Sequence, residues 1–483
     1  MAEQVAERAG SEQASGNLRG NLGVASIVFT VLAFNAPLGT AAGFVPVLIG
    51  YGNQDGAPST FIVVAVVLTL FSVGLMAMSR YMSSPGAFYS YIVAGLGRIP
   101  GLGAAFTAFG AYTAFCLCSY AYGGIVANAM VHGLFHGPDI SWWIYSLVMW
   151  VVSTILSMLH MELSARVLGV ALVAEVVLVL LWGLRVFFNG APEGVSLHPF
   201  TVSAFTSGSL PVGLLFGALC ITGFEAVAVF RKEARDPVRT VKRATYGSVA
   251  VMCGLYAFTA WADLTAYGHT AVQHAAADPS GSFVSSVHTY VGSTASDLVT
   301  VLLVSSVFAS IPAVQSIAAR YLYTLGSDGV LPRSLGRIHT TQGSPYVAAA
   351  WFSALCLIGI IVPAITGLDP LRVYSSCAAI GSVCLVVLMF ATSLAILTFF
   401  HRDSTHTATR LEAQVAPALA LVGIGGVLYL AITHMPDIIG AGRTAADLAL
   451  AFIVLLAVAG AGLASYLRAQ RPEIFARIGR QDL

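Results

Sequence analysis

Long apolar stretches constrain this chain more than any other feature of its sequence. Crossing a bilayer takes about 20 apolar residues, so each such stretch is a candidate membrane helix. The candidates are 22–49, 59–79, 101–131, 141–160, 166–188, 209–230, 245–267, 296–324, 346–366, 372–400, 413–433 and 446–467. Only 9% of the residues are charged, against about 25% in soluble domains. We therefore expect an all-α membrane protein with 12 transmembrane helices, because backbone polar groups within the bilayer must be satisfied inside the structure.

The placement of lysine and arginine predicts the orientation of these helices. If the N-terminus is inside, 20 of the 23 Lys and Arg residues lie on the inner side, and only Arg185, Arg372 and Arg443 lie outside. Loops rich in Lys and Arg normally stay in the cytoplasm. We therefore expect a multi-pass protein of the plasma (inner) membrane with both termini cytoplasmic. Residues 1–20 are expected to form a flexible cytoplasmic tail, and 468–483 a second cytoplasmic tail.

The first span carries residues that a continuous helix avoids. Its middle reads Asn35-Ala36-Pro37-Leu38-Gly39-Thr40-Ala41-Ala42-Gly43. Proline removes a backbone hydrogen bond and clashes with the preceding turn, and glycine adds backbone freedom. We expect this helix to be broken near the bilayer midplane. A proline kink without any binding site is the alternative interpretation.

The sixth span has a similar weakness. Gly217–Ala226 contains two glycines and the carboxylate of Glu225 within an apolar segment. The first and sixth spans are five apart and therefore enter the membrane in opposite directions. Two five-helix inverted repeats with discontinuous helices, and a substrate between the half-helix ends, are typical of secondary transporters. The expected units are a first repeat at 21–190, a second, inverted repeat at 208–400, and two extra C-terminal helices, 11 and 12, at 413–467.

Three motifs then point to a family. Gly223-Phe224-Glu225, followed by Lys232-Glu233-Ala234-Arg235-Asp236-Pro237-Val238-Arg239-Thr240, resembles the sixth-helix signature of the amino acid–polyamine–organocation (APC) superfamily. Ser84–Tyr91 and Arg320–Pro332 resemble the segment leading into helix 3 and the end of helix 8 in that family. The resemblance implies a leucine-transporter-like fold that works by alternating access, usually on amino acids or related amines. The chain departs from the family pattern at Ile221, where relatives often carry an aromatic residue, and at Lys232, which replaces an acid.

An amino acid zwitterion needs donors for its carboxylate and acceptors for its ammonium group. Broken helices supply both, as free N–H groups at one half-helix end and free C=O groups at another. Asn35 and Thr222 are the polar side chains most expected to touch a ligand, and local capping of freed backbone groups is an equal alternative. Span 3 offers a further wall with Tyr112, Ser119 and Tyr122. The candidate substrate-binding residues are Asn35, Ala36, Leu38, Gly39, Thr40, Ala41, Leu219, Cys220, Ile221, Thr222, Gly223 and Asn128. For Asn128, helix-to-helix bonding is the commoner role of such a residue.

Coupling or gating is expected from two carboxylates and two serines. Ionisable residues inside membrane spans usually mark function. Glu175 lies among Val, Leu and Ala in span 5, where the resemblance implies a position that carries a proton-titrating lysine in some relatives. Glu225 belongs to the family motif, which implies gating or helix packing. In sodium-coupled relatives, hydroxyls of helix 8 hold the ion, so Ser305 and Ser306 join the set. Structural roles remain open for all four, and a proton is slightly favoured over Na⁺.

Other chemistry has no support in the sequence. The seven cysteines lie in apolar runs without a Cys-x-x-Cys pair, so we expect buried apolar side chains rather than disulfides or a metal site. The isolated Glu175 and Glu225 supply no paired catalytic set, so we expect no enzymatic activity. We also expect no cofactor and no nucleic-acid partner. The first hypothesis is a secondary active transporter of amino acids or related amines in the lipid bilayer, with small neutral amino acids as the default substrate and a proton (or Na⁺) as the coupling ion. An uncoupled exchanger is the alternative within transport. A non-transporting membrane sensor on the same fold is the alternative from another class.

Overall fold

The structure is a computed structural model that describes most of the chain. The described residues are 23–82, 88–159, 165–189, 192–221, 223, 224, 227, 236–279, 281–338, 345–402, 407–440 and 442–479. Within them every regular element is a helix and none is a strand, in agreement with the predicted all-α class. The predicted tail at 1–20, much of the Ser84–Tyr91 motif and the run Arg231–Arg235 lie outside the described residues.

Nine helical segments of the described chain are long and apolar enough to cross a membrane. The helices they contain are α5 (Ala57–Ser79), α7 (Arg98–Ala129), α9 (Ala165–Phe188), α12 (Pro237–Tyr267), α15 (Ser293–Ser327), α16 (Tyr346–Thr366), α17 (Pro370–Arg402), α18 (Ala416–Thr433) and α20 (Gly442–Gln470). Shorter apolar helices occupy Pro37–Tyr51, the start of α8 (Trp142–Leu159) and α11 (Leu210–Leu219). Each of the twelve apolar stretches predicted from the sequence therefore overlaps a helix.

Short elements connect or extend these helices. Two of the additional α-helices are α2 (Val24–Asn35) and α6 (Phe88–Leu96), which precede the first break and α7. The others are α3 (Pro37–Gly39), α4 (Val45–Tyr51), α10 (Val202–Phe205), α13 (Ala271–Ala277), α14 (Ser282–Tyr290), α19 (Met435–Ile439) and α21 (Pro472–Arg477). Tighter or wider helical turns are η1 (Thr40–Phe44), η2 (Gln54–Gly56), η3 (Met130–Leu134), η4 (His198–Phe200), η6 (Gly268–Thr270), η7 (Arg333–Gly336) and η8 (Leu411–Val415).

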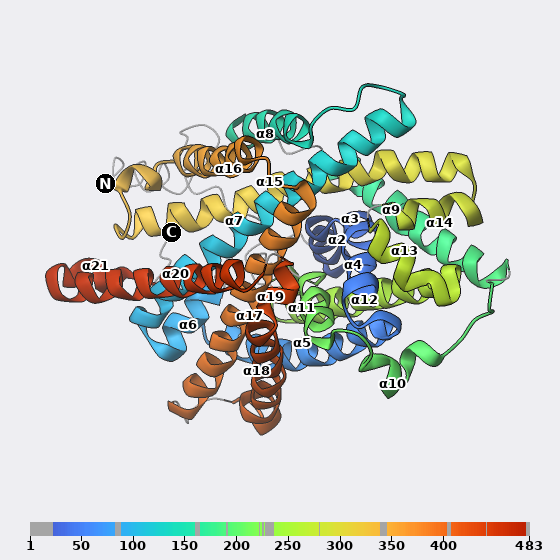
Figure 1. The fold of residues 1–483 in the computed structure, drawn as a ribbon. Helices are drawn as coiled ribbons and strands as arrows, with labels where there is room; N and C mark the ends of the chain where they lie inside the picture. The colour runs from blue at the N-terminus through green and yellow to red at the C-terminus, as the bar shows by residue number, and fades with distance from the viewer. Residues whose placement is uncertain are drawn as a thin grey trace, which may run out of the picture.

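The first span lies inside the bundle. Helix α2 packs against α9, α12 and α15, α3 packs against α9 and α15, and α4 packs against α11 and α12. Figure 1 shows this dark-blue segment surrounded by later helices rather than at an edge. Many side chains along it, such as Leu38, Ala41 and Leu48, are completely buried. An irregular backbone at membrane depth is tolerated only where protein or a cavity surrounds it, and this position meets that condition.

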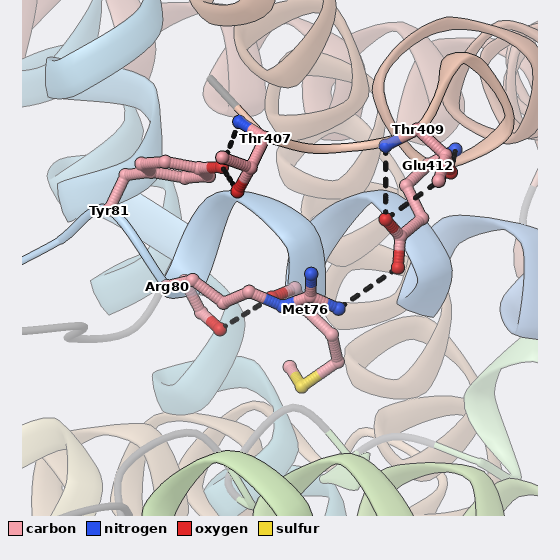
Figure 2. Close-up of polar contacts among 7 residues, drawn as sticks. Met76, Arg80, Tyr81, Thr407, Thr409 and Glu412 are labelled. Atoms are coloured by element: carbon pink, nitrogen blue, oxygen red, sulfur yellow. Dashed lines mark hydrogen bonds and ion pairs between the residues drawn. The ribbon is translucent and has the colours of Figure 1, made fainter. Parts of the chain in front are cut away.

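Contacts between helix ends group the arginine-rich connections at one end of the bundle. The Arg80 guanidinium, after α5, pairs with Glu412 of η8 at 2.9 Å, and the Tyr81 hydroxyl lies 3.1 Å from that of Thr407, as Figure 2 shows. At the end of α17, Arg402 donates to the Gly95 carbonyl at 3.2 Å. The ends of α5, α6, α17 and the start of α18 therefore meet at one end of the bundle.

The connections poor in lysine and arginine meet one another elsewhere. Asn53 donates to the Phe205 carbonyl at 3.1 Å, and Tyr51 donates to the Ala276 carbonyl at 2.7 Å. His269 contacts Glu193 through its ring and its backbone N–H. These hydrogen bonds from His269 hold the pKa of the exposed Glu193 carboxyl below its usual value.

The backbones of helices α20 and α7 are in direct contact where the helices cross, because each helix has a glycine at the crossing. A Cβ on Gly460 would lie 2.5 Å from the Leu102 carbonyl oxygen, and one on Gly103 would lie 2.8 Å from the Ala457 carbonyl oxygen. Small residues at such crossings are the usual means of packing membrane helices.

We expect Gly460→Val to destabilise the fold by about 1–3 kcal/mol, because the new side chain forces the two backbones apart. Gly462→Val is the matched control, since a Cβ there meets nothing within 4 Å. Thermal unfolding midpoints of the two purified variants check this expectation. Equal midpoints would show that the crossing can relax.

Candidate functional site

The first span is broken at Ala36, as its proline and glycines predict. Helix α2 ends at Asn35, and α3 begins at Pro37, which needs no N–H partner at a helix start. Ala36 between them has φ 48° and ψ 74°, a left-handed conformation that costs a non-glycine residue roughly 1–2 kcal/mol. After α3 the chain runs through the wide turn η1 before α4 resumes a regular helix.

Polar side chains stabilise this break from within. The Thr40 hydroxyl lies 2.9 Å from the Asn35 carbonyl oxygen and 3.0 Å from the Asn35 Oδ1. The Tyr256 hydroxyl, from α12, donates to the same Oδ1 at 2.7 Å. Asn35 and Thr40 therefore make the local bonds that the capping alternative predicts. Both residues also line a cavity, so capping and ligand contact do not exclude each other here.

The sixth span stops being an α-helix in its middle. Helix α11 ends at Leu219, and the Ile221 N–H donates to the Ala218 carbonyl at 3.3 Å in a tight turn. Gly223 has φ 101°, a conformation that favours glycine. The candidates Thr222 and Glu225 lie outside the described residues.

A cavity of about 90 Å³ lies beside both interrupted helices. Its wall comes from five segments that are far apart in the sequence, and none of the lining residues is charged. The lining residues are Asn35, Ala36, Gly39, Thr40, Phe44, Phe115, Cys118, Ser119, Tyr122, Leu219, Val307, Ser310, Val314 and Tyr374. The volume is below the roughly 300–1,000 Å³ of pockets for drug-sized ligands, so only a small ligand fits the cavity.

Aromatic rings form one side of the cavity. Tyr374 of α17 stacks on Tyr122 of α7 with ring centroids 5.0 Å apart, and on Phe44 of η1 at 5.3 Å. Gly43 makes this possible, because a Cβ there would come within 2.8 Å of the Tyr122 ring. Ile221, the position where the family often places an aromatic residue, is fully buried behind the wall. Residues of spans 1, 3 and 10 supply the aromatic surface instead.

Two tyrosine hydroxyls at this site have no hydrogen-bond partner in the described part of the chain. The hydroxyl oxygens of Tyr122 and Tyr374 are both buried and make no hydrogen bond within the described residues. A buried hydroxyl without a partner costs roughly 1–3 kcal/mol. A polar ligand that reached these groups would recover that free energy.

Glu175 connects the break to two other helices. Its Oε2 atom accepts a hydrogen bond from the Leu38 N–H at 3.3 Å and another from the Ser306 hydroxyl at 2.8 Å. The side chain belongs to α9 and is only 3% exposed. It therefore meets the first turn of α3 and the middle of α15. Glu175 lies behind the cavity wall, because Gly39 and Val307, the neighbours of its two partners, line the cavity.

The two serine candidates of α15 face different ways. Ser306 is buried and donates to Glu175, whereas Ser305 is exposed and donates to the Leu302 carbonyl of its own helix at 2.8 Å.

We expect Ser306→Ala to lower activity roughly tenfold, because a hydrogen bond to a charged group contributes roughly 1.5–3 kcal/mol. Ser305→Ala should leave activity unchanged. Uptake is measured for the two variants side by side. If Ser306→Ala and Ser305→Ala have equal effects, the hydrogen bond from Ser306 to Glu175 has no role in the mechanism.

The other predicted site residues lie at varied distances from the cavity. Leu38, Ala41, Cys220 and Ile221 are buried but do not line it. Asn128 belongs to the end of α7, where its amide donates to Asp139 at 2.8 Å and accepts from the Ile140 N–H at 3.2 Å. The structure thus gives Asn128 the role of holding a connecting segment, because α7 has by then run past the cavity, and we do not retain it as a ligand residue.

Several residues of the site were missed in the sequence. Tyr256 and Tyr374 are phenols in apolar spans, and that polarity was the one signal that could have drawn notice to them. Phe44, Phe115, Cys118, Val307 and Val314 resemble ordinary core residues, and only the packing of the helices brings them to the cavity. The described residues contain no group of three His, Cys, Asp or Glu side chains that could hold a metal ion.

Comparison with known proteins adds a family match. A family model described as "Amino acid permease" matches residues 25–460, which is most of the chain.

Two curated proteins are similar to this chain at low sequence identity. The branched-chain amino acid permease BcaP of Lactococcus lactis subsp. cremoris (strain MG1363) is 24% identical over 275 residues, covering 55% of this chain and 55% of that protein. The low-affinity putrescine importer PlaP of Escherichia coli (strain K12) is 24% identical over 364 residues, covering 71% of this chain and 75% of that protein. The chain thus spans about half the length of the first relative and three quarters of the second.

Proposed function

The chain belongs to the amino acid permease family, and on that premise we propose that it is a secondary active transporter of small neutral amino acids, coupled to protons. The family match agrees with the superfamily resemblance read from the motifs, and it makes the chain a multi-pass membrane permease rather than an enzyme. The substrate class, the coupling ion, the repeat architecture and the orientation in the membrane are proposals.

The proposed substrate class rests on the absence of charged residues from the cavity wall. One relative is named for branched-chain amino acids and the other for putrescine. Putrescine carries two positive charges at neutral pH and no carboxylate, and an unpaired charge in a buried site is very costly. None of the lining residues here is acidic. A zwitterion with a small apolar side chain suits this lining because its two charges compensate each other.

The ends of the interrupted helices offer partners for both charges. The Leu38 N–H is already bonded to Glu175, so we assign the substrate carboxylate to the Gly39 N–H in the first turn of α3, where helix N-termini favour anions. We assign the ammonium group to the carbonyl end of α11 at Leu219, because last-turn carbonyls lack helical donors. The hydroxyls of Tyr122 and Tyr374, which make no hydrogen bond to any described residue, complete the polar contacts.

The proposed architecture is two inverted five-helix repeats, at 21–190 and 208–400, followed by two further helices. The breaks after α2 and α11, five spans apart, support this arrangement. Alternating access then moves the interrupted helices relative to α7 and α15. Both termini are proposed to be cytoplasmic in a plasma (inner) membrane, supported by the meeting of arginine-bearing helix ends at one end of the bundle.

Proton coupling rests on the position of Glu175. As a carboxylate it accepts from both Leu38 and Ser306 and so ties α3 to α15. A proton on the carboxyl removes acceptor capacity and charge, which loosens that tie when the helices must move. Na⁺ held by the same oxygens is the alternative ion, and an exchanger without coupling is the alternative mechanism.

A ligand panel tests the substrate class. We expect alanine, valine and leucine to raise the thermal unfolding midpoint of the purified protein, since a ligand that binds only the folded state stabilises it. Putrescine at the same concentration should give no shift. A shift from putrescine alone would reverse the proposed substrate class, and no shift from any amino acid would remove its support.

A further inference from the structure

A second, larger cavity lies away from the one described above. It has a volume of about 950 Å³ and is bordered by the ends of α6, α7, α17 and α20 together with α21. Figure 1 shows the red helices α20 and α21 running from the middle of the molecule to its left margin, and α20 packs against α7. Tyr81, whose hydroxyl contacts Thr407 in Figure 2, also lines this cavity. It therefore lies at the arginine-rich end of the bundle.

The charges on its wall have one sign. Arg98 and Arg468 are the charged residues among those that line it, and no lining residue is acidic. Asp328 acts on Tyr89 nearby but does not line the cavity. The neighbouring Arg402 already donates to the Gly95 carbonyl. Within the described residues, Arg98 and Arg468 form no ion pair, and no acidic residue among them lines the cavity.

Arg98 gives a second sign that an anion belongs here. Its Nε atom is buried without a hydrogen-bond partner among the described residues, and its guanidinium lies 5.6 Å from the centre of the Phe475 ring. Arg98 is also the first residue of the 32-residue helix α7, whose N-cap Gly97 supplies no side-chain cap. The first turn of a long helix presents free N–H groups and a positive dipole end to an anion.

The rest of the wall is apolar. Val93, Leu96, Ile99, Phe399 and Phe475 line the same space as the two arginines. Arg98 begins one candidate membrane span and Arg468 lies near the end of another, at Gln470. Both charges therefore lie at the depth of lipid head groups, with apolar surface next to them. A soluble anion would contact only the two arginines, whereas an anionic lipid would contact the arginines with its head group and the apolar residues with its acyl chains.

We propose that this cavity binds the phosphate of an anionic phospholipid, held by Arg98, Arg468 and the first turn of α7, with the acyl chains along the apolar wall. Basic pockets between membrane helices at the cytoplasmic surface are suited to such head groups. The site is separate from the proposed transport cavity and does not depend on it. Its role is to hold α21 and the end of α20 against α6 and α7.

The test compares lipids on the full-length protein purified in detergent. Phosphatidylglycerol should raise the thermal unfolding midpoint, and phosphatidylcholine should not. Arg98→Gln and Arg468→Gln should each weaken the apparent affinity for phosphatidylglycerol roughly tenfold, since each removes a charge-assisted contact. Arg471→Gln is the matched control, because Arg471 follows the same helix and does not line the cavity.

Different results would contradict different parts of the proposed lipid site. Equal shifts with both lipids, or equal loss in Arg471→Gln, would overturn the site. A shift with glycerol phosphate as large as that with phosphatidylglycerol would replace the lipid by a free phosphate ester. Because Arg98 also packs on Phe475, the exposed Arg468 carries the test if Arg98→Gln does not fold.

Discussion

Gly39→Leu should abolish uptake, with a loss of roughly hundredfold or more, because the added side chain occupies the space proposed for the substrate. Gly39 lines the cavity, and a Cβ there already lies 3.2 Å from Val307. A leucine side chain is comparable with the whole cavity of about 90 Å³, and overpacking by roughly 3 kcal/mol corresponds to such a factor. Gly39→Ala should reduce uptake to an intermediate extent, since its methyl group can be accommodated by a small shift of Val307.

The control for this pair is Gly462→Leu on α20, where an added Cβ meets nothing within 4 Å. Uptake into proteoliposomes and the thermal midpoint are measured for all three variants. The account expects Gly39→Leu to stay folded and to lose both uptake and the amino acid-dependent shift. If a folded Gly39→Leu transports normally, the substrate does not pass this cavity.

Glu175→Gln should remove the effect of pH on transport and lower proton-driven accumulation at least tenfold. Glutamine keeps the size of the side chain and one oxygen acceptor for Leu38 or Ser306, but it carries no titrating proton. Exchange of labelled for unlabelled amino acid needs no net proton movement, so it should persist. The tenfold figure corresponds to roughly 1.4 kcal/mol, about the lower limit for the contribution of a hydrogen bond to a charged group.

Glu193→Gln is the matched control for Glu175→Gln. Its bonds to His269 hold the pKa of the Glu193 carboxyl low, so this carboxyl stays ionised as the pH falls from neutral towards the ordinary range of glutamate. Its replacement should leave the pH profile of uptake unchanged. A profile that is flat in Glu193→Gln and unchanged in Glu175→Gln would contradict the assignment. A profile unchanged in both would make Glu175 a structural residue.

Much of the fold could be predicted because membrane helices leave strong local signals. Apolar length locates the spans, and Pro37 with Gly39 locates the break of the first one, since both residues act on their own backbone. The same reasoning places Asn35, Ala36, Gly39, Thr40 and Leu219 at the cavity.

The rest of the site depends on helix packing that no local pattern encodes. Tyr374 reaches the cavity because α17 packs on α7, and Tyr122 because Gly43 leaves room for its ring. Ser305 and Ser306 are adjacent in sequence, yet only the rotation of α15 decides which one meets Glu175. Asn128 lies away from the cavity for a related reason, since α7 is long enough to carry it past the cavity to Asp139.

The most direct test of the account is uptake of a labelled neutral amino acid into proteoliposomes that contain no amino acid, under an imposed pH gradient. The account predicts accumulation above the outside concentration, abolished by a protonophore, absent in Gly39→Leu, and unaffected by excess putrescine. Uptake that requires amino acid preloaded inside, regardless of the gradient, would establish the exchanger instead. Failure to accumulate any neutral amino acid under either condition would contradict the central claim.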